Sequence, residues 1–511
     1  MLSLLLILLL SLSAIGAYVD LPYYPLASIK NPVSASANPS VVIKSGADPS
    51  KTLCDAEVKK LVYNVLDLAR FDQLLTPDIK TVLLKPNIVE PLESGSGVIT
   101  DYRVVENIAS YIYEKNPSLK IIVGEGAGGW VPAGYEWGAF PGAKASDGFE
   151  IAGYRNMVLK LKKSYPKIDI EIVDLNIPLE DLVEVKPKKP LSEDIYYIHR
   201  LVHDCDLYVS VPVLKIIETC QVTLSIKNNV GLAAGAVYGW SKNRGFPYTK
   251  NQGGLRHTYP VIDEEIVDLT QVRVPDFVII DGIVGMEKDK TNFRRGVKKQ
   301  ANLIIAGKDP VAVDAAACLL MGLNPRDIEH IALAYYLGLG SIYPTICGDS
   351  LESLSSKWIK PDPKYSPRGH FGQGVRIFEV SADDQIFSEP LLFMDTLINP
   401  WVLGNASKYT LRTWFSLAED LDLEMWVGSD NNLSISLDDK PIYLHQGKRK
   451  HALPNDIVPI SVSTGSHELT ITLPKKGIFS LTMAEVLPKN LKNRSFYTGT
   501  TPLQLIWRWE D

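Results

Sequence analysis

The fold is decided by three consecutive stretches: KTVLLK at residues 80–85, VVENIASYIYE at 104–114 and KIIVGEG at 120–126. The first and third are short apolar runs typical of buried strands. The second spaces its apolar residues as an amphipathic helix does. A strand, a helix and another strand in this order predict a unit of a largely parallel sheet.

The same alternation continues outward from about residue 40 to 380. Further candidate strands are SVVIK, IDIEIVDL, DLYVSVPV, DFVIIDG and ANLIIAG, and further candidate helices are Ala56–Arg70, Val311–Met321 and Ile328–Leu337. Near-continuous apolar strands separated by helices indicate a sheet that is buried on both faces. We therefore predict an α/β domain over residues 40–385, with helices on both faces of a largely parallel sheet.

The pattern changes near residue 390, where helical periodicity gives way to alternating runs such as YTLRTWF, NLSISLD and HELTITL. Such runs predict an all-β sandwich over residues 390–511. The pair LSISLDDKPIY and TGSHELTITL resembles secreted sugar-binding modules of the jelly-roll type. Five tryptophans lie here, namely Trp401, Trp414, Trp426, Trp507 and Trp509. They suggest glycan as a partner, and the alternative is that they pack in the core.

Residues 2–17 form an apolar, uncharged run that ends in small residues. This predicts a secretory signal over residues 1–17, followed by a Pro- and Ser-rich linker at 18–39. The protein would then be secreted or extracytoplasmic. The alternative is an uncleaved anchor, so contact with a membrane is expected only through this segment.

The overall charge and the cysteines exclude two classes of function. A net charge of -6 and a pI near 5.9 give no basic surface for nucleic acid, so none is expected as a partner. The five cysteines form no CxxC pair and no iron–sulfur spacing, so no iron–sulfur cluster is expected. Cys205 and Cys220 would be free to pair in an exported chain.

Charged and amide side chains follow several of the apolar runs. They are Lys85 and Asn87 after TVLL, Glu125 after IIVG, Lys215 after LYVSVPVL, Lys227 and Asn228 after TLSI, and Asp281 after FVII. Ligands of open α/β sheets bind just outside the carboxyl ends of the strands. The sequence therefore predicts a small-molecule or metal site at this edge.

Lysines suit a phosphate or carboxylate group, so a small anionic ligand is the predicted partner. Lys85 would bind the anion and Asn87 would donate or accept hydrogen bonds, although the KPN stretch also suits a strand-end turn. Lys215 or Lys227 would polarise a substrate or act as acid or base. Asp314, in the apolar helix VAVDAAAC, needs a partner, and we expect Lys85 or Lys227 to provide it.

Carboxylates suit hard cations, so Glu125, Asp281 and Glu287 are predicted to hold a divalent cation as a possible cofactor. Glu125 also lies in GEGAGG, a glycine-rich loop that can present backbone N–H groups to an anion.

Other polar residues have structural interpretations. Asp101 and Asp309 are expected to cap helices. His199 and His203 are interpreted as a surface or satisfied histidine pair, and the alternative is a zinc-type pair, because a spacing of four would place both imidazoles on one face of a helix.

An ordered set of motifs resembles the family called domain of unknown function 362. The motifs are LLKPNIV, ITDYRVVENI, VGEGAGG, DLYVSVPVLK, TLSIKNNVGL, VIIDGIVGMEKD, AGKDPVAVDAAACLLMG and HIALAYYLGLG. The resemblance covers about residues 40–345 and implies an α/β domain, but no established reaction. Two features depart from the family pattern. Lys215 is not followed by the usual His, and the segment after Met286 lacks the usual glycines.

Three classes of function stay open at this point. The domain is an enzyme with lysine- or metal-assisted chemistry, a surface protein that binds a ligand and glycan, or a scaffold that has lost its site. The reaction itself is not assigned.

Overall fold

The computed structural model divides the chain into two compact units, which we describe separately. An α/β unit comprises Asn31–Pro361, and an all-β unit comprises Met1–Lys30 with Asp362–Asp511. The structure describes residues 23–25, 39–46, 48, 50–135, 144–217, 219–240, 242, 254–255, 262–288, 296–323, 325, 328–359, 377–383, 385–386, 391–393, 397–398, 400–417, 420–452, 454–474 and 476–485.

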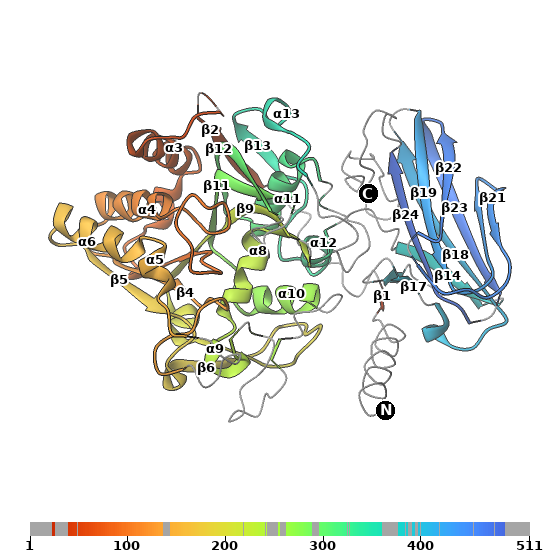
Figure 1. Ribbon diagram of the computed structural model, residues 1–511, viewed down its shortest axis with the longest axis horizontal. Coiled ribbons are helices and arrows are strands. Elements are labelled where there is room, and N and C mark those ends of the chain that lie inside the picture. The colour runs from red at the N-terminus through yellow and green to blue at the C-terminus, as the bar shows by residue number, and fades with distance from the viewer. Residues whose placement is uncertain are drawn as a thin grey trace. The chain divides into compact units, whose positions relative to one another are not determined.

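The α/β unit is built on a ten-stranded mixed sheet (Figure 1). Its strands along the sheet are β13 (Thr345–Gly348), β2 (Ser40–Ser45), β12 (Val297–Gly307), β11 (Phe277–Glu287), β8 (Leu207–Val211), β3 (Thr81–Pro86), β4 (Lys120–Glu125) and β5 (Asp169–Asp174), with β9 (Val213–Ile217) and β10 (Gln221–Thr223) at the side. The strands from β11 to β5 are parallel, whereas β12 pairs antiparallel with both β11 and β2. This confirms the predicted largely parallel sheet.

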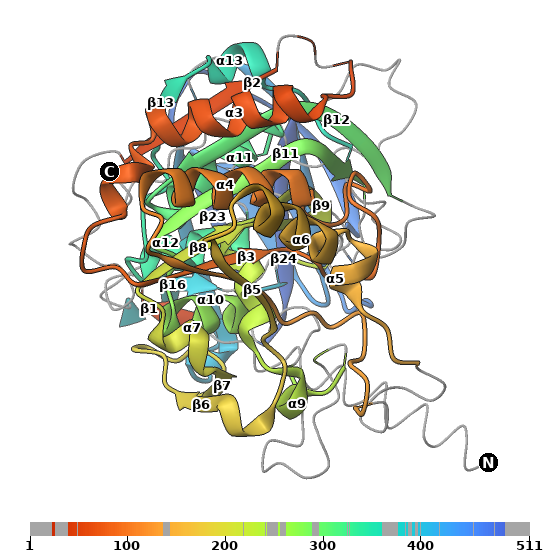
Figure 2. The same cartoon turned by 90° about the vertical axis from the view of Figure 1, so that its left-hand side faces the viewer.

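Helices cover both faces of this sheet. Those on one face are α3 (Asp55–Leu68), α4 (Tyr102–Lys115) and α6 (Tyr154–Ser164), which lie across the sheet in Figure 2. Those on the other are α8 (Ser225–Asn228), α10 (Ile262–Val272), α11 (Pro310–Leu320) and α12 (Glu329–Tyr336) (Figure 1). Because both faces are covered, strands such as β8 are buried at every residue.

Shorter elements complete the α/β unit. They are α5 (Gly148–Ile151), β6 (Leu182–Val185), β7 (Tyr196–His199), α7 (Arg200–Asp204), α9 (Gly235–Tyr238), α13 (Leu351–Leu354) and 3-10 turns at Phe71–Leu74, Leu179–Asp181 and Asn229–Leu232. The four predicted helices begin and end within two residues of α3, α4, α11 and α12. The predicted strand DLYVSVPV divides into β8 and β9 because Pro212 has no N–H to donate to a ladder.

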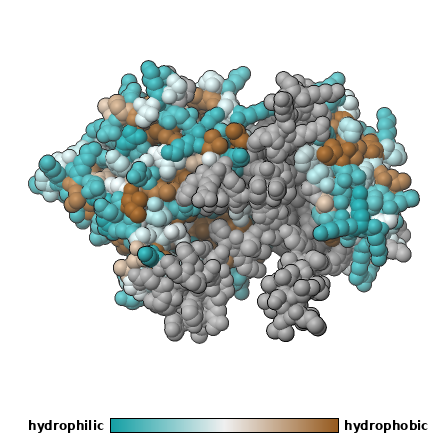
Figure 3. All heavy atoms as spheres, viewed as in Figure 1, coloured by the Kyte–Doolittle hydropathy of each residue, from teal (hydrophilic) through white to brown (hydrophobic). Residues whose placement is uncertain are grey.

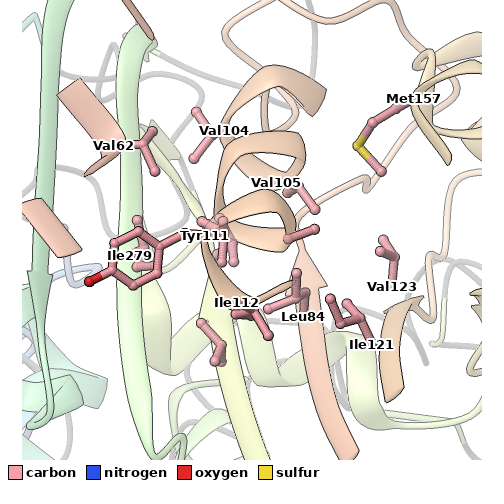
Figure 4. Packing of buried hydrophobic residues seen from close by; sticks show 14 of the residues in the cluster. Val62, Leu84, Val104, Val105, Tyr111, Ile112, Ile121, Val123, Met157 and Ile279 are labelled. Atoms are coloured by element: carbon pink, nitrogen blue, oxygen red, sulfur yellow. The ribbon is translucent and has the colours of Figure 1, made fainter. Parts of the chain in front are cut away.

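The core on one face shows how α4 is held. Its Val104, Val105 and Ile112 pack with sheet residues such as Leu84 and Ile279 (Figure 4). The helix begins where the Asp101 carboxylate accepts a hydrogen bond from Arg103 N, as predicted. Asp309 caps α11 in the same way.

The surface carries the complementary pattern. Hydrophilic residues cover much of the described surface in the face shown in Figure 3, with hydrophobic residues scattered among them. Leu68 and Leu159 are examples of exposed apolar side chains in the α/β unit. Scattered surface apolar residues are normal in globular proteins and need no functional explanation.

The all-β unit consists of two antiparallel sheets that share one core, which confirms the predicted C-terminal β-sandwich. One sheet contains β1 (Tyr23–Pro25), β16 (Leu391–Phe393), β14 (Ile377–Ala382), β15 (Gln385–Ile386), β18 (Lys408–Leu417), β23 (Gly465–Pro474), β20 (Leu433–Leu437) and β21 (Lys440–His445). The other contains β17 (Leu397–Ile398), β24 (Phe479–Glu485), β19 (Leu421–Ser429) and β22 (Asp456–Val462), and a 3-10 turn spans Pro400–Leu403. Leu411, Ile471 and Met425 are core residues contributed by both sheets.

The boundary between the units lies earlier than the predicted gap at 385–390. Strand β14 pairs with β18, so residues 377–382 are part of the all-β unit, and the division falls after Pro361. The predicted linker at 18–39 contains a strand, because β1 pairs with β16. The predicted signal at 1–17 lies outside the described residues. Among those that are described, no helix is long and apolar enough to cross a membrane.

Candidate functional site

A cavity of about 220 Å³ lies where β3 and β4 end beside α8. Five of the predicted site residues line it together: Lys85, Asn87, Glu125, Lys227 and Asn228. The other lining residues are Val89, Glu90, Gly126, Ala127, Gly128, Gly129, Val230, Gly231 and Lys242. The predicted position of a site at the carboxyl ends of the strands therefore coincides with a real cavity.

A buried ion pair forms one wall of the cavity. Lys85 Nζ lies 2.8 Å from Glu125 Oε1, and both side chains are almost completely buried. The carboxylate also accepts hydrogen bonds from the backbone N–H groups of Ile88 and Gly126. Burial lowers the pKa of Lys85, Glu125 opposes that shift, and the charge of Lys227 reinforces it.

Asn228 connects this pair to the rest of the sheet edge. Its Oδ1 accepts from Lys85 Nζ at 3.0 Å, and its Nδ2 donates to Lys85 O and Ser210 Oγ. Asn87 lies next to it and accepts from Lys215 Nζ at 2.7 Å. Lys215 is itself buried outside the cavity lining and also donates to Val98 O, so it supports Asn87 from behind.

Lys227 differs from the other buried cations at this edge. Its side chain is 7 % exposed and lines the cavity, and it makes no hydrogen bond or ion pair with the residues that the structure describes. No described residue supplies a counter-charge to this ammonium, and an anion in the cavity would supply one.

The prediction placed Lys227 and Asn228 after a strand, but both lie on the short helix α8. The cause is Asp314. Its Oδ1 accepts from Ser225 N and Oγ at 2.8 and 2.6 Å, and its Oδ2 accepts from Ile226 N at 3.0 Å. The expected partner lysine is therefore wrong, because N–H groups at the start of α8 satisfy this carboxylate. Burial raises the pKa of Asp314 to about 7, and these hydrogen bonds oppose the rise.

Lys242 belongs to the site and was missed by the sequence analysis. It is 3 % exposed, lines the cavity, and donates to Asn176 Oδ1 at 3.1 Å and to Ala233 O. Burial lowers its pKa to about 7, with Glu125 opposing the shift and Lys85 adding to it. The only hint in the sequence is that Lys242 follows the large aromatic residue Trp240 by two positions, and the burial of Trp240 becomes clear only in the structure.

Two glycines let the backbone approach the ion pair. A Cβ on Gly231 would lie 2.4 Å from Glu125 Oε1 and 2.5 Å from Lys85 Nζ. A Cβ on Gly126 would lie 2.3 Å from Gly231 O. Gly231, in the 3-10 turn after α8, therefore brings backbone against the two charged side chains, and Gly126 of the glycine-rich loop packs against Gly231, so a larger residue does not fit at either position.

The three carboxylates predicted to share a cation are apart. Glu125 is paired with Lys85, whereas Asp281 accepts from the backbone N–H groups of Asp101 and Ile283. Glu287 accepts from Ile359 N at 3.0 Å. No cluster of three or more potential ligands that could hold a metal occurs among the described residues.

Asp281 is also not at a strand end. Its strand β11 continues to Glu287 because it pairs with β12 along its length, with an irregularity after Gly282. The apolar run that was read as a complete strand is only the first half of a longer one.

The structure also places the two cysteines and two histidines singled out from the sequence. Cys205 and Cys220 are both buried, and neither is in a disulfide. His199 caps α7 through a hydrogen bond from Leu201 N, and His203 is exposed beside Asp204.

Two described tryptophans of the all-β unit have buried or paired positions. Trp426 is buried, and Trp414 donates its indole N–H to Glu468 Oε2 at 2.9 Å. Trp507 and Trp509 lie outside the described residues. Glycan binding stays a prediction.

Taken together, the cavity is lined by the buried pair of Lys85 and Glu125, by Lys227, which has no partner among the described residues, and by the buried Lys242. These groups can bind an anion and can hold or transfer protons. Asp314, Asp281 and Glu287 do not line it.

Comparison with known proteins supports the family resemblance. Residues 82–319 match the family model described as Domain of unknown function (DUF362), so the resemblance is confirmed over the central part of the α/β unit. No curated protein matched the chain.

Solved structures gave distant likenesses. The lactate racemase apoprotein from Thermoanaerobacterium thermosaccharolyticum is 13 % identical with a TM-score of 0.28, over 53 % of this chain and 54 % of that one. A β-glucosidase from Kluyveromyces marxianus is 9 % identical with a TM-score of 0.19, over 22 % of this chain and 16 % of that one. A PA14 sugar-binding domain from an RTX adhesin is 11 % identical with a TM-score of 0.15, over 22 % of this chain and 68 % of that one. The chain thus spans about half or less of the first two proteins.

Proposed function

We propose, for an α/β unit that resembles a family without an established reaction, that its cavity binds a small molecule carrying a carboxylate or phosphate group. The observation that carries the proposal is Lys227, a buried ammonium that lines the cavity and has no partner among the described residues. A bound anion would supply the counter-charge that the fold does not. Electrostatic attraction of this kind is strong where water is excluded.

The surrounding groups favour an anion over a cation. Glu125 is already paired with Lys85, so its charge is largely compensated. Of the other lining residues, Lys227 carries a positive charge and Glu90 a negative one, and Glu90 lies outside the pair that Lys85 and Glu125 form. Its volume of about 220 Å³ lies below the range of pockets for drug-sized ligands, so the ligand is a small metabolite.

The test is thermal-shift screening of the full chain with inorganic phosphate, oxalate and malate, and with glucose as an uncharged compound. We expect the anions to raise the Tm and glucose to leave it unchanged. A ligand at a hundred times its Kd stabilises a protein by about 2.7 kcal/mol, which is easily measured. Lys227→Met should reduce the shift to about half at the same anion concentration, because the Kd rises about tenfold.

Lys160→Met is the matched control, because Lys160 lies on α6 of the same unit with a 55 % exposed side chain that pairs with Glu106. It removes the same charge from the chain and should keep the full shift. Equal shifts in both variants, or no shift with any anion in the wild type, would contradict the proposal.

A further inference from the structure

The three lysines at the cavity differ in the number of oxygen atoms that accept from them. Lys85 Nζ donates to three, namely Glu125 Oε1, Asn228 Oδ1 and Pro86 O. Within the part of the chain that the structure describes, Lys242 Nζ donates to two and Lys227 Nζ to none. An ammonium has three N–H groups and a neutral amine has two, so these numbers separate the chemical roles of the lysines.

Lys85 has the environment of an ammonium. Its three acceptors match three N–H groups, and one acceptor is a carboxylate at 2.8 Å. No lone pair is left on this nitrogen, so it is not a nucleophile while the pair is intact. Lys227 has the environment of an anion-binding cation, as argued above.

Lys242 has the environment of a neutral amine. Both of its acceptors, Asn176 Oδ1 and Ala233 O, are uncharged amide oxygens. Two N–H groups are enough for these two acceptors, and no third acceptor for this nitrogen occurs among the described residues, so a lone pair can occupy its fourth tetrahedral position. The nitrogen is also held in place, because Asn176 itself is anchored by Gly235 N and Ala127 O. The low pKa of Lys242, about 7, supplies the free amine at neutral pH.

We propose that the ligand is a small carbonyl compound with an anionic group, and that Lys242 Nζ forms an imine with its carbonyl carbon. Lys227 binds the anionic group, so this inference rests on the function proposed above. A carbon–nitrogen bond forms and the carbon–oxygen double bond breaks. The oxygen leaves as water with both amine hydrogens, and no oxidant or other reactant is consumed.

The test is reductive trapping of the full chain with sodium borohydride, using pyruvate and dihydroxyacetone phosphate as separate probes. An imine is reduced to a stable amine, which we expect as one added probe per chain in the intact mass. Peptide mapping should place it on Lys242. Lys242→Arg should give no adduct, because a guanidinium forms no imine, and Lys160→Met should label like the wild type.

Lys227→Met should still label at Lys242 but should need about tenfold more probe for half-maximal labelling, since an anion contact of about 1.4 kcal/mol is lost. Adduct formation on Lys227 or on surface lysines instead of Lys242 would overturn the assignment. Mapping of the wild type decides this even where a variant does not fold.

Oxalate separates the two proposals, because it carries charge but no ketone or aldehyde. Stabilisation by oxalate with no trapping of either probe would overturn the imine and leave the anion site standing. If oxalate gives no stabilisation and neither probe is trapped, both the anion site and the imine are overturned. Trapping at Lys242 together with stabilisation by oxalate is the result expected.

Discussion

Charged side chains occur at or after buried apolar runs in two regions of the α/β unit, and their partners differ between the two regions. At the ends of β3 and β4, Lys85 and Glu125 pair with each other at the wall of a cavity. On β11, Asp281 is satisfied by the backbone N–H groups of Asp101 and Ile283. One sequence pattern thus yields a candidate binding site in one place and a structural bond in the other.

The difference lies in what the neighbours offer. A carboxylate that meets the start of a helix, as Asp281 meets α4, finds N–H groups without partners and needs nothing else. A lysine ammonium has only hydrogen-bond donors, so backbone N–H groups cannot satisfy it and it needs acceptor atoms instead. Buried lysines at a strand edge are therefore the more informative sign of a site, and the following experiments test this comparison.

The largest effect is expected from Glu125→Gln. The amide has the same shape but leaves the Lys85 ammonium buried without a counter-charge. Removing one partner of a buried pair typically costs about 3–5 kcal/mol of unfolding free energy. Denaturant unfolding measures it.

Glu171→Gln on β5 is the control for that experiment. The pair between Glu171 and Lys120 is also 2.8 Å long but its side chains are 44 % and 39 % exposed. Its loss should cost at most about 1 kcal/mol. Similar losses in the two variants would mean that burial does not distinguish these pairs.

Asp314→Asn should have the next largest effect. One carboxylate oxygen becomes an NH₂ group that faces Ile226 N, and an unsatisfied buried donor costs about 1–3 kcal/mol. Because α8 carries Lys227, oxalate affinity should fall as well, which isothermal titration would show. Unchanged affinity in a destabilised but folded variant would mean that Asp314 does not position the site.

Lys227→Met should act in the opposite direction in the absence of ligand. It replaces a buried cation without a partner by an apolar side chain of similar length, so we expect stabilisation of about 0.5–2 kcal/mol. Denaturant unfolding of the ligand-free chain measures this, with Lys160→Met close to the wild type. A clear loss of stability would show that Lys227 has a structural role.

The last expected effect concerns pH and Asp281. Burial, followed by the negative charge of Asp101, raises the pKa of Asp281 to about 7, above its unfolded value near 3.8. The folded state then binds the proton more tightly, so this contribution to stability is present below about pH 4 and is lost as the pH rises towards 7. Unfolding free energies at pH 5 and pH 8 should therefore differ less in Asp281→Asn than in the wild type. If the change in unfolding free energy between the two pH values is the same in the variant and the wild type, another group binds the proton.

The fold was predictable because its signals are local. The helices α3, α4, α11 and α12 show their own periodicity and caps, and β3, β4 and β8 are long apolar runs. The division at Pro361 was not predictable in the same way, because β14 is assigned to the all-β unit only by its pairing with β18.

The site was predictable in part for the same reason. Lys85 and Glu125 lie at the ends of neighbouring parallel strands and Asn87 directly follows the first, so their proximity was predictable. Lys242 lines the cavity from the segment after α9, where no periodic pattern indicates a site. The three carboxylates do not form one cluster, because Asp281 and Glu287 accept from the backbone N–H groups of Asp101 and Ile359, which are distant in the chain. The residues next to a carboxylate in the sequence do not reveal whether a distant backbone N–H group will donate to it.

The pairing of β1 with β16 has a consequence for biosynthesis. The α/β unit is inserted in the chain between the first strand of the all-β unit and its remaining strands. As the chain leaves the ribosome, all of residues 31–361 emerge before β16 is available to pair with β1. The inserted unit is free to fold while its host is still unfinished. A stalled or truncated chain would therefore carry the complete candidate cavity together with an unpaired β1, and this exposed strand is a feature that cellular quality control could recognise.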